Sequence, residues 1–316
     1  MPARIAAARR VRVEARAKLN LGLAVGPRRP DGFHELATVF QSISLADTLE
    51  IEPRRSGFSL EVRHEDVSLR GGGKRATLRF VPAGDENLVL RAARRLAARA
   101  GRIGGARFRL VKRIPARAGL GGGSADAAAA LVGLSALYGL RLRPEARLAL
   151  ALELGADVPF ALRGGTALGL GRGERLRRTG LERPFRALIA VPAWRISTPW
   201  AFGRIDRRKY GLTAWKAKRR FAQVLGRQRI TAERALRLGN DFEDVLESRR
   251  SDYLSLRHRL ESAGVCGIRM TGSGSAVFGI VSPGSSAYKV AGRFAGKEPL
   301  FLVRSSRAGL RLHMLR

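Results

Sequence analysis

The chain has 316 residues, 45% of them hydrophobic and 27% charged, a composition that excludes a disordered protein and indicates one large domain or two lobes. The one cysteine excludes an internal disulfide, the 4 histidines lack the spacing of a zinc site, and no apolar run reaches the ~20 residues of a membrane-spanning helix. The formal charge of +34 comes mainly from arginines spread along the whole sequence, so it does not by itself assign nucleic-acid binding.

In the first part of the chain, alternating apolar residues predict strands, and apolar residues at helical spacing predict helices. Turn signals rich in glycine and proline separate these elements, as at 26–32, directly after the first strand. The predicted strands cover 10–25, 46–53, 58–64 and 106–114, with a strand pair over 164–176, and the predicted helices cover 86–101, about 124–137 and 143–155.

The second part of the chain follows a boundary near 177–185, where turn residues and charges interrupt the pattern. The predicted elements there are a strand over 186–192, helices over 231–238 and 241–264, and a strand–loop–strand unit over 267–281. The order of elements predicts a mixed α+β fold with an N-terminal lobe over 1–182 and a C-terminal lobe over 183–316.

The residues from Gly119 to Gly123 are all glycine except Leu120, and sequence typical of a helix follows them directly. Glycines let backbone N–H groups approach a ligand, and a helix N-terminus directs unpaired N–H groups and a positive dipole into the same space. This combination favours phosphate. Ser124 is expected as the N-cap or as a hydroxyl facing the phosphates, with Asp126 in the first turn. The alternative is a turn that only permits tight helix packing.

The loop lacks the Gly-Lys-Ser/Thr of a Walker loop and the βαβ context of a dinucleotide fingerprint. Its glycine spacing, followed by Ser-x-x-Ala, instead resembles the phosphate loop of the GHMP kinases, such as galactokinase, homoserine kinase and mevalonate kinase. The segments 15–51, 153–176 and 269–280 resemble those of one branch of this family, the 4-diphosphocytidyl-2-C-methyl-D-erythritol kinases. In order and spacing these motifs cover most of the chain from about Ala15 to Ile280.

The resemblance implies the α+β GHMP kinase fold, with an N-terminal lobe like the second domain of ribosomal protein S5 and a ferredoxin-like C-terminal lobe. It implies phosphorylation of the 2-hydroxyl of 4-diphosphocytidyl-2-C-methyl-D-erythritol, a step of non-mevalonate isoprenoid biosynthesis. ATP is then the co-substrate, and Mg²⁺ is expected. We further expect a cytoplasmic enzyme with no membrane association, and nucleic acid bound only by non-specific electrostatics.

The resemblance also assigns roles to individual residues. Asp157 matches the catalytic aspartate, the general base, and Lys18 matches its partner, whose ammonium would keep the carboxylate ionised. From the residues alone, Asp157 before Val158 and Pro159 would equally cap a turn. The residues expected to bind ATP are Pro115, Gly119, Leu120, Gly121, Gly122, Gly123, Ser124, Asn87 and Lys112. The residues expected to bind the acceptor are Asn20, Phe33, His34, Phe40 and Phe202, with His34 at the cytosine ring; no metal ligand is assigned.

Three residues depart from the pattern of the family. Phe33 stands where a tyrosine is usual, Ala125 replaces the second serine of the phosphate loop, and Arg117 replaces a small residue. Two other functions stay open. One is another GHMP kinase activity, against which the cytosine-contact motif at 31–34 argues, and the other is an arginine-rich nucleic-acid-binding protein that would not require both Lys18 and Asp157.

Overall fold

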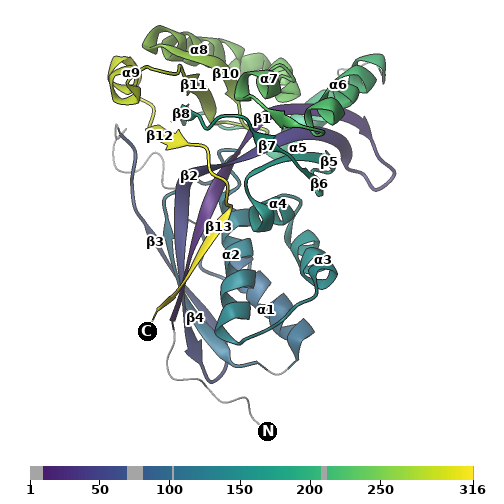
Figure 1. Cartoon of the computed structure of the whole chain (residues 1–316), viewed down its shortest axis with the longest axis vertical. Coiled ribbons are helices and arrows are strands. Elements are labelled where there is room, and N and C mark those ends of the chain that lie inside the picture. Colours follow the sequence, from purple (N-terminus) through teal and green to yellow (C-terminus); the bar gives the residue numbers. More distant parts are fainter. Residues whose placement is uncertain (1–9, 70–80, 102, 208–211, 316) are drawn as a thin grey trace.

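The computed structural model describes residues 10–69, 81–101, 103–207 and 212–315. Its larger sheet has the strand order β13-β1-β2-β4-β3, and β5 pairs with β2 and with β6 (Figure 1). The strands are β1 (Arg10–Arg28), β2 (His34–Arg54), β3 (Phe58–His64), β4 (Gly105–Lys112), β5 (Thr166–Gly171), β6 (Arg175–Arg178) and β13 (Leu310–Leu315).

Strands β1 and β2 form the long antiparallel hairpin on which both lobes are built. β1 continues through Arg28, into the segment predicted as a turn, and β2 begins at His34 rather than near residue 46. The sequence hides this first half of β2 because Ala37 to Ile43 are buried on both faces of the sheet. A strand buried on both faces carries no alternation of apolar and polar residues.

Four helices cover one face of the larger sheet: α1 (Leu88–Ala100), α2 (Gly122–Leu137), α3 (Pro144–Leu154) and α4 (Val158–Arg163). Ala125 and Ala127 to Ala130 of α2 are buried, and a Cβ on Gly133 would overlap the Ile51 side chain, so small residues let this helix lie directly on the sheet. The prediction that Ser124 caps this helix was wrong. Its N-cap is Gly121, and Asp126 lies beyond the first turn, which contains no acidic residue.

The smaller sheet has the order β10-β11-β8-β12. Its strands are β8 (Arg186–Ala190), β10 (Val265–Met270), β11 (Val277–Val281) and β12 (Leu300–Arg304). Helices α8 (Arg250–Ala263) and α9 (Ala287–Arg293) pack on one side of it. On its other side, Ile189, Phe278 and Phe301 share a core with Leu19 and Leu21 of β1.

The remaining elements lie around the region where the smaller sheet packs against β1. The predicted helix over 241–264 is divided, because two 3₁₀ turns, η1 (Asp241–Val245) and η2 (Glu247–Arg249), precede α8. Helix α7 (Ala232–Leu236) lies where a helix was predicted. The other elements are α5 (Thr198–Arg207), α6 (Leu212–Leu225) and the parallel pair of β7 (Gly180–Leu181) and β9 (Arg229–Ile230).

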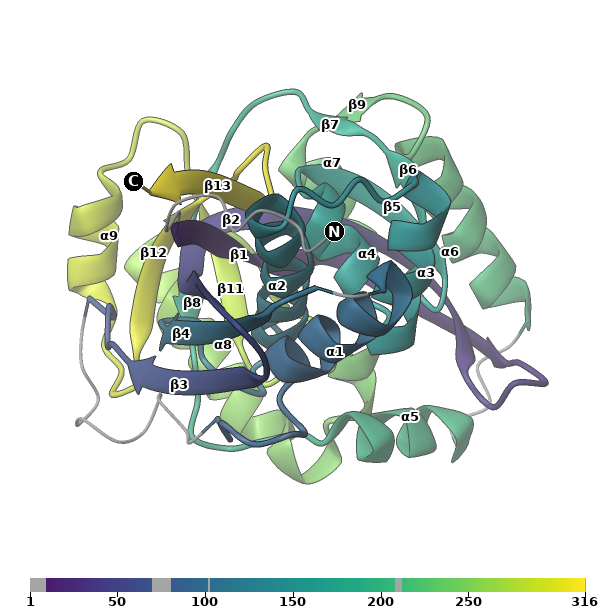
Figure 2. The ribbon, with the colours of Figure 1, turned by 90° about the horizontal axis from the view of Figure 1, so that it is seen from below.

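The last strand, β13, returns to the larger sheet and pairs antiparallel with the start of β1, as Figure 2 shows from below. The division of the chain at 182 and 183 into two lobes stays a prediction. Across the described ranges, every helix is too short or too polar to cross a membrane. The expected cytoplasmic location likewise stays a prediction.

Candidate active site

The glycine loop, residues 119–123, lies where the two sheets meet. Gly119 has φ 80°, and a Cβ there would overlap the carbonyl oxygen of Thr271, at the start of the loop 271–276 between β10 and β11. Backbone hydrogen bonds join the segments, from Lys18 N to Leu120 O (3.0 Å) and from Ala276 N to Ala118 O (3.1 Å). The glycine at position 119 therefore permits the glycine loop and the loop 271–276 to lie in direct contact beside β1.

The N-terminus of α2 opens from this loop. Gly121 caps the helix with φ 71°, and no side chain makes a capping hydrogen bond. Gly123 is exposed, and Ser124, in the first turn, is partly exposed. The first N–H groups of a helix have no partner within the helix, so this terminus is suited to bind an anion.

Lys18 of β1 and Asp157, at the N-cap of α4, face each other beside the glycine loop. Lys18 Nζ lies 3.5 Å from Asp157 Oδ2, with side chains that are 8% and 33% exposed. Asp157 makes no side-chain capping bond to α4, so its carboxylate does not perform the capping role that its sequence position permits. The nearly buried ammonium of Lys18 and the more accessible carboxylate of Asp157 thus lie side by side.

Asn20 holds the lysine in place. Its Oδ1 accepts a 2.6 Å hydrogen bond from Lys18 Nζ, and its Nδ2 donates to Thr38 Oγ1 at 2.7 Å. Its backbone N–H donates to Thr271 Oγ1 at 3.0 Å, from the second lobe. Phe40 lies beneath, with its ring 5.6 Å from Lys18 Nζ and stacked on Phe160 at 4.7 Å. The ammonium therefore has one well-defined position.

A cavity of about 390 Å³ brings most of the predicted site residues together. It extends from the glycine loop, past Lys18 and Asp157, to an aromatic end. The predicted residues that line it are Lys18, Asn20, Phe33, His34, Phe40, Gly119, Gly121, Ser124, Asp157 and Phe202.

At the aromatic end, His34 and Phe202 stack with their ring centroids 5.1 Å apart. His34 Nδ1 lies 2.8 Å from the carbonyl oxygen of Gly26, and Nε2 lies 3.1 Å from Asp206 Oδ1. Both ring nitrogens thus have partners within the chain. Phe33 is 54% exposed, with the Arg172 guanidinium 4.7 Å above its ring, so it offers a flat apolar face at the rim.

The other predicted ATP-binding residues lie outside the lining of this cavity, although Leu120, Gly122 and Gly123 belong to the same loop. Asn87 caps α1, with its Oδ1 accepting from Val89 N at 2.9 Å. Pro115 is buried. Lys112 is also buried, and its Nζ lies 2.6 Å from Asp126 Oδ2 and contacts Asp47 as well. Adenosine contacts by Asn87 and Lys112 stay predictions.

The electrostatics beneath the glycine loop follow from this burial. Burial raises the pKa of Asp126 to about 8, although the Lys112 ammonium opposes the shift. Burial lowers the pKa of Lys112, but Asp126 and Asp47 more than reverse this effect and raise it. Asp126 Oδ1 has no hydrogen-bond partner.

Several residues of the cavity were not predicted from the sequence. Thr198 of α5 and Ser273 of the loop 271–276 line it, and their hydroxyls lie 2.9 Å apart. Ser273 lies in a segment that resembles the family, so that resemblance was the available signal. Arg172 likewise lies in such a segment, 153–176. Nothing in the local sequence indicated Asp206, which contacts His34 from outside the cavity lining.

Comparisons with known proteins agree with this arrangement. The model of the GHMP kinases N terminal domain matches residues 87–165, and the model of the GHMP kinases C terminal matches residues 224–298. A 4-diphosphocytidyl-2-C-methyl-D-erythritol kinase of Pelotomaculum thermopropionicum is 41% identical over 92% of this chain and 95% of its own length. One of Salinispora arenicola is 40% identical over 94% of this chain and 91% of its own.

Solved structures give the same result. The crystal structure of a 4-(cytidine 5'-diphospho)-2C-methyl-D-erythritol kinase has a TM-score of 0.72 and 34% identity, covering 93% of this chain and 99% of its own. The mevalonate kinase of L. major, solved with R-mevalonate, has a TM-score of 0.65 at 14% identity, covering 93% and 95% of the two chains. This second likeness shows the fold alone.

Proposed function

Because the chain belongs to the GHMP kinases and, within them, to the 4-diphosphocytidyl-2-C-methyl-D-erythritol kinases, we propose that it phosphorylates the 2-hydroxyl of 4-diphosphocytidyl-2-C-methyl-D-erythritol with ATP. This is a reaction of non-mevalonate isoprenoid precursor biosynthesis. The single observation that supports it best within the site is the ion pair of Lys18 and Asp157, 3.5 Å apart beside the glycine loop.

The glycine loop and the N-terminus of α2 are proposed to hold the phosphates of ATP. Gly119, Gly121 and Ser124 all line the cavity, on the same side as the unpaired N–H groups of the helix. Transfer of a phosphoryl group depends mainly on positioning and on stabilising negative charge. Backbone N–H groups and the helix dipole supply both without any side-chain cation from the loop itself.

Asp157 is proposed as the base that takes the proton of the acceptor hydroxyl. Its carboxylate is the accessible member of the pair, with 33% of its side chain exposed, and it is not engaged in a helix cap. A base must lie within hydrogen-bond reach of the hydroxyl that it deprotonates, which a carboxylate lining the cavity permits.

Lys18 is proposed to keep Asp157 ionised and to stabilise negative charge as it develops between the acceptor oxygen and the phosphoryl group. Its hydrogen bond to Asn20 leaves the ammonium with further donors for these contacts. Asn20 then has a positioning role, since it connects Lys18 to Thr38 and to Thr271 of the second lobe.

The cytidine of the acceptor is proposed to lie at the aromatic end of the cavity. Phe33 and Phe202 offer ring faces, on which a base can stack. His34 has both ring nitrogens engaged, by Gly26 and Asp206. An edge-on hydrogen bond from its ring to cytosine would therefore require Asp206, on α5, to give up its contact.

Mg²⁺ is proposed to enter with the nucleotide. The residues fit this role, because the cavity holds the Asp157 carboxylate and the Ser124 hydroxyl, and Mg²⁺ in kinases takes most of its ligands from phosphates and water. In the described segments, no group of three or more metal-ligating side chains gathers. The ion would supply neutralisation of phosphate charge, while Lys18 and Asp157 act on the acceptor.

A turnover assay tests the proposal. Purified protein is given ATP and Mg²⁺ with 4-diphosphocytidyl-2-C-methyl-D-erythritol, or instead with homoserine, galactose, mevalonate or methylerythritol phosphate. We expect rapid turnover of the first compound alone, because polar groups of a cytosine site are left unpaired by acceptors that lack the base. Equal rates with methylerythritol phosphate would overturn the cytidine assignment, and a preference for another acceptor would assign a different GHMP kinase activity.

A further inference from the structure

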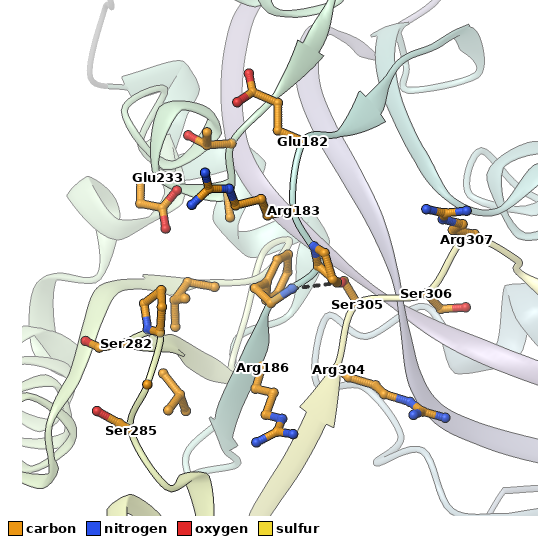
Figure 3. Close-up of a pocket in the computed structure, with 18 of the residues that line it drawn as sticks. Glu182, Arg183, Arg186, Glu233, Ser282, Ser285, Arg304, Ser305, Ser306 and Arg307 are labelled. Carbon is orange, nitrogen blue, oxygen red and sulfur yellow. Dashed lines mark hydrogen bonds between the residues drawn. The ribbon is translucent and has the colours of Figure 1, made fainter.

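A second and larger cavity, of about 890 Å³, lies away from the candidate active site and shares none of its lining residues. It lies at one end of the strands of the smaller sheet, at the starts of β8 and α7 and the ends of β11 and β12 (Figure 3). Its volume falls within the range of about 300–1,000 Å³ that is typical of small-molecule sites. The kinase reaction proposed above assigns nothing to it.

The walls of this cavity combine an apolar surface with positive charge. Phe185, Ile280 and Val281 are buried and form its apolar part. Glu182 and Glu233 are its acidic residues, and the arginines outnumber them, so the lining has a net positive charge. The arginines are Arg16, Arg183, Arg186, Arg304 and Arg307.

Arg186 and Arg304 are the central pair. They occupy directly opposite positions on antiparallel β8 and β12, so their side chains leave the same face of the sheet. Like charges placed in this way repel each other. Figure 3 shows the two side chains extending from neighbouring strands, with Arg183 and Glu233 at the opposite end of the view.

Most of these arginines have no acidic partner. Some arginines elsewhere pair with carboxylates, as Arg12 does with Glu50 at 2.7 Å and Arg113 with Glu65 at 2.7 Å, although the chain has far more basic than acidic residues, 60 against 26. Within the described part of the chain, no ion pair is formed by Arg183, Arg186, Arg304 or Arg307. An anion in the cavity would relieve the repulsion that the chain itself leaves uncompensated.

Arg16 is the arginine of this lining that contacts other side chains of the described residues. Its side chain is 20% exposed, it donates through Nη1 to Ser306 Oγ, and it lies 3.7 Å from Glu14. Its Nε is buried and has no hydrogen-bond partner in the structure. Ser306 is itself fixed by a bond from the Ala308 N–H, so this corner of the cavity is preformed rather than assembled by mobile side chains.

We propose that this cavity binds a small organic phosphate, with its phosphate between Arg186 and Arg304 and its apolar part against Val281, the buried neighbour of Arg186 on the same face of the sheet. The arginine guanidinium suits phosphate because it donates two parallel hydrogen bonds. The apolar part of the wall distinguishes the site from a purely electrostatic surface, since it stabilises a ligand that carries carbon as well as charge. The hydroxyls of Ser282 and Ser285 line the same cavity and add donors.

The experiment measures binding of 1-naphthyl phosphate, with inorganic phosphate and 1-naphthol as comparison probes, by titration calorimetry. The variant Arg186→Gln/Arg304→Gln removes the central pair, and Ser285→Trp fills the cavity from an exposed loop without a change of charge. The matched control is Arg219→Gln/Arg220→Gln, which removes two exposed arginines of α6 outside the cavity. Thermal melting verifies that each variant is folded.

We expect 1-naphthyl phosphate to bind more tightly than either comparison probe. Its affinity should fall about tenfold or more in both cavity variants, since charge-assisted hydrogen bonds are strong, and stay within about twofold in the control. Kinase turnover without the probe should be unchanged in all variants. Probe bound only at the glycine loop would be retained in every variant, and this result would overturn the proposal. An equal loss in the control would indicate diffuse electrostatic attraction and would also overturn the proposal. In a parallel titration with a short RNA, tighter binding that depends on Arg186 and Arg304 would assign the cavity to nucleic acid and overturn it as well.

Discussion

Lys112 Nζ lies 2.6 Å from Asp126 Oδ2, and the same ammonium contacts Asp47, so three elements of the first lobe meet in one buried ionic cluster. Lys112 belongs to β4, Asp126 to α2 and Asp47 to β2. A Cβ on Gly122 would lie 3.2 Å from the ammonium, which places the cluster directly beneath the start of α2. The cluster thus supports the helix terminus that is proposed to bind phosphate.

This cluster predicts a pH dependence of stability. Burial raises the pKa of Asp126 from 3.8 to about 8, so between these two values the folded state holds a proton that the unfolded state has lost. The stability that protonated Asp126 contributes is therefore full below pH 3.8 and is lost as the pH rises through about 8. The pKa of Lys112 is also raised, so that residue stays charged over this window and adds no slope. In guanidinium titrations, the free energy of unfolding should fall with pH more steeply in the wild type than in Asp126→Asn, by at most about 1.4 kcal/mol per pH unit. Parallel profiles for the two proteins would contradict the buried titration.

Asp157→Asn is expected to lower kcat by about 10²- to 10⁴-fold, because it removes the base and the charge beside Lys18. The nucleotide contacts the glycine loop, so its affinity should change little, a pattern that marks an interaction needed in the transition state. Steady-state kinetics and ATP titration measure the two quantities. Glu153→Gln, at an exposed carboxylate shortly before, is the control and should be active. Near-normal kcat in folded Asp157→Asn would require another base.

Gly119→Ala should weaken ATP binding and lower the melting temperature, because its Cβ would overlap Thr271 O. Gly139→Ala is a matched control, since Gly139 has φ 63° but a Cβ there meets nothing within 4 Å. Both variants carry the cost of alanine at positive φ, roughly 1–2 kcal/mol. The difference between them therefore isolates the contact between the two loops. We expect kcat/KM for ATP to fall about tenfold or more only in Gly119→Ala, and equal losses would contradict the contact.

Phe202→Ala should raise KM for the cytidine substrate more than it lowers kcat, because stacking on a base stabilises the bound substrate by about 1–3 kcal/mol. Trp200→Ala, on the same helix and 36% exposed outside the cavity, should leave both parameters near wild type. Steady-state kinetics with varied acceptor measures them. A fall in kcat alone would place Phe202 elsewhere in the mechanism.

RNA binding should be weak and should vanish as the salt concentration approaches about 0.15 M, if the arginines are a solvated surface. Kinase turnover should need no nucleic acid. Fluorescence anisotropy with labelled oligonucleotides of different sequence measures the affinity at each salt concentration. Tight binding with a preferred sequence at physiological salt would favour the nucleic-acid alternative.

The sequence predicted those elements whose pattern is local. The helix of Val89 to Leu96 and the alternating strand through Phe108 lie where expected, because each has one face that is more deeply buried than the other. The predicted helix over 241–264 does not run unbroken, since Glu247, the first residue of η2, adopts φ 39°. A positive φ in a glutamate depends on tertiary packing, which no local pattern records.

The candidate site shows the same limit. The glycine loop was predicted from chemistry alone, but the start of its helix was misplaced because Gly121, and not Ser124, adopts the capping conformation. The role of Asp157 depended on family resemblance, since its local sequence also fits a turn. The bond between Thr198 and Ser273 joins segments far apart in the chain, so only the folded structure reveals it.

The pairing of β13 with β1 has a consequence for biosynthesis. Leu315 pairs with Arg10, so the outer edge of the larger sheet is completed by residues that leave the ribosome after those of the smaller sheet. Until then β1 exposes unpaired N–H and C=O groups along that edge, a template for pairing with other chains. Contacts at such sequence separation are slow to form. The nascent chain therefore completes its first sheet only after its second lobe has been made, and a ribosome stalled before residue 310 would hold an aggregation-prone intermediate.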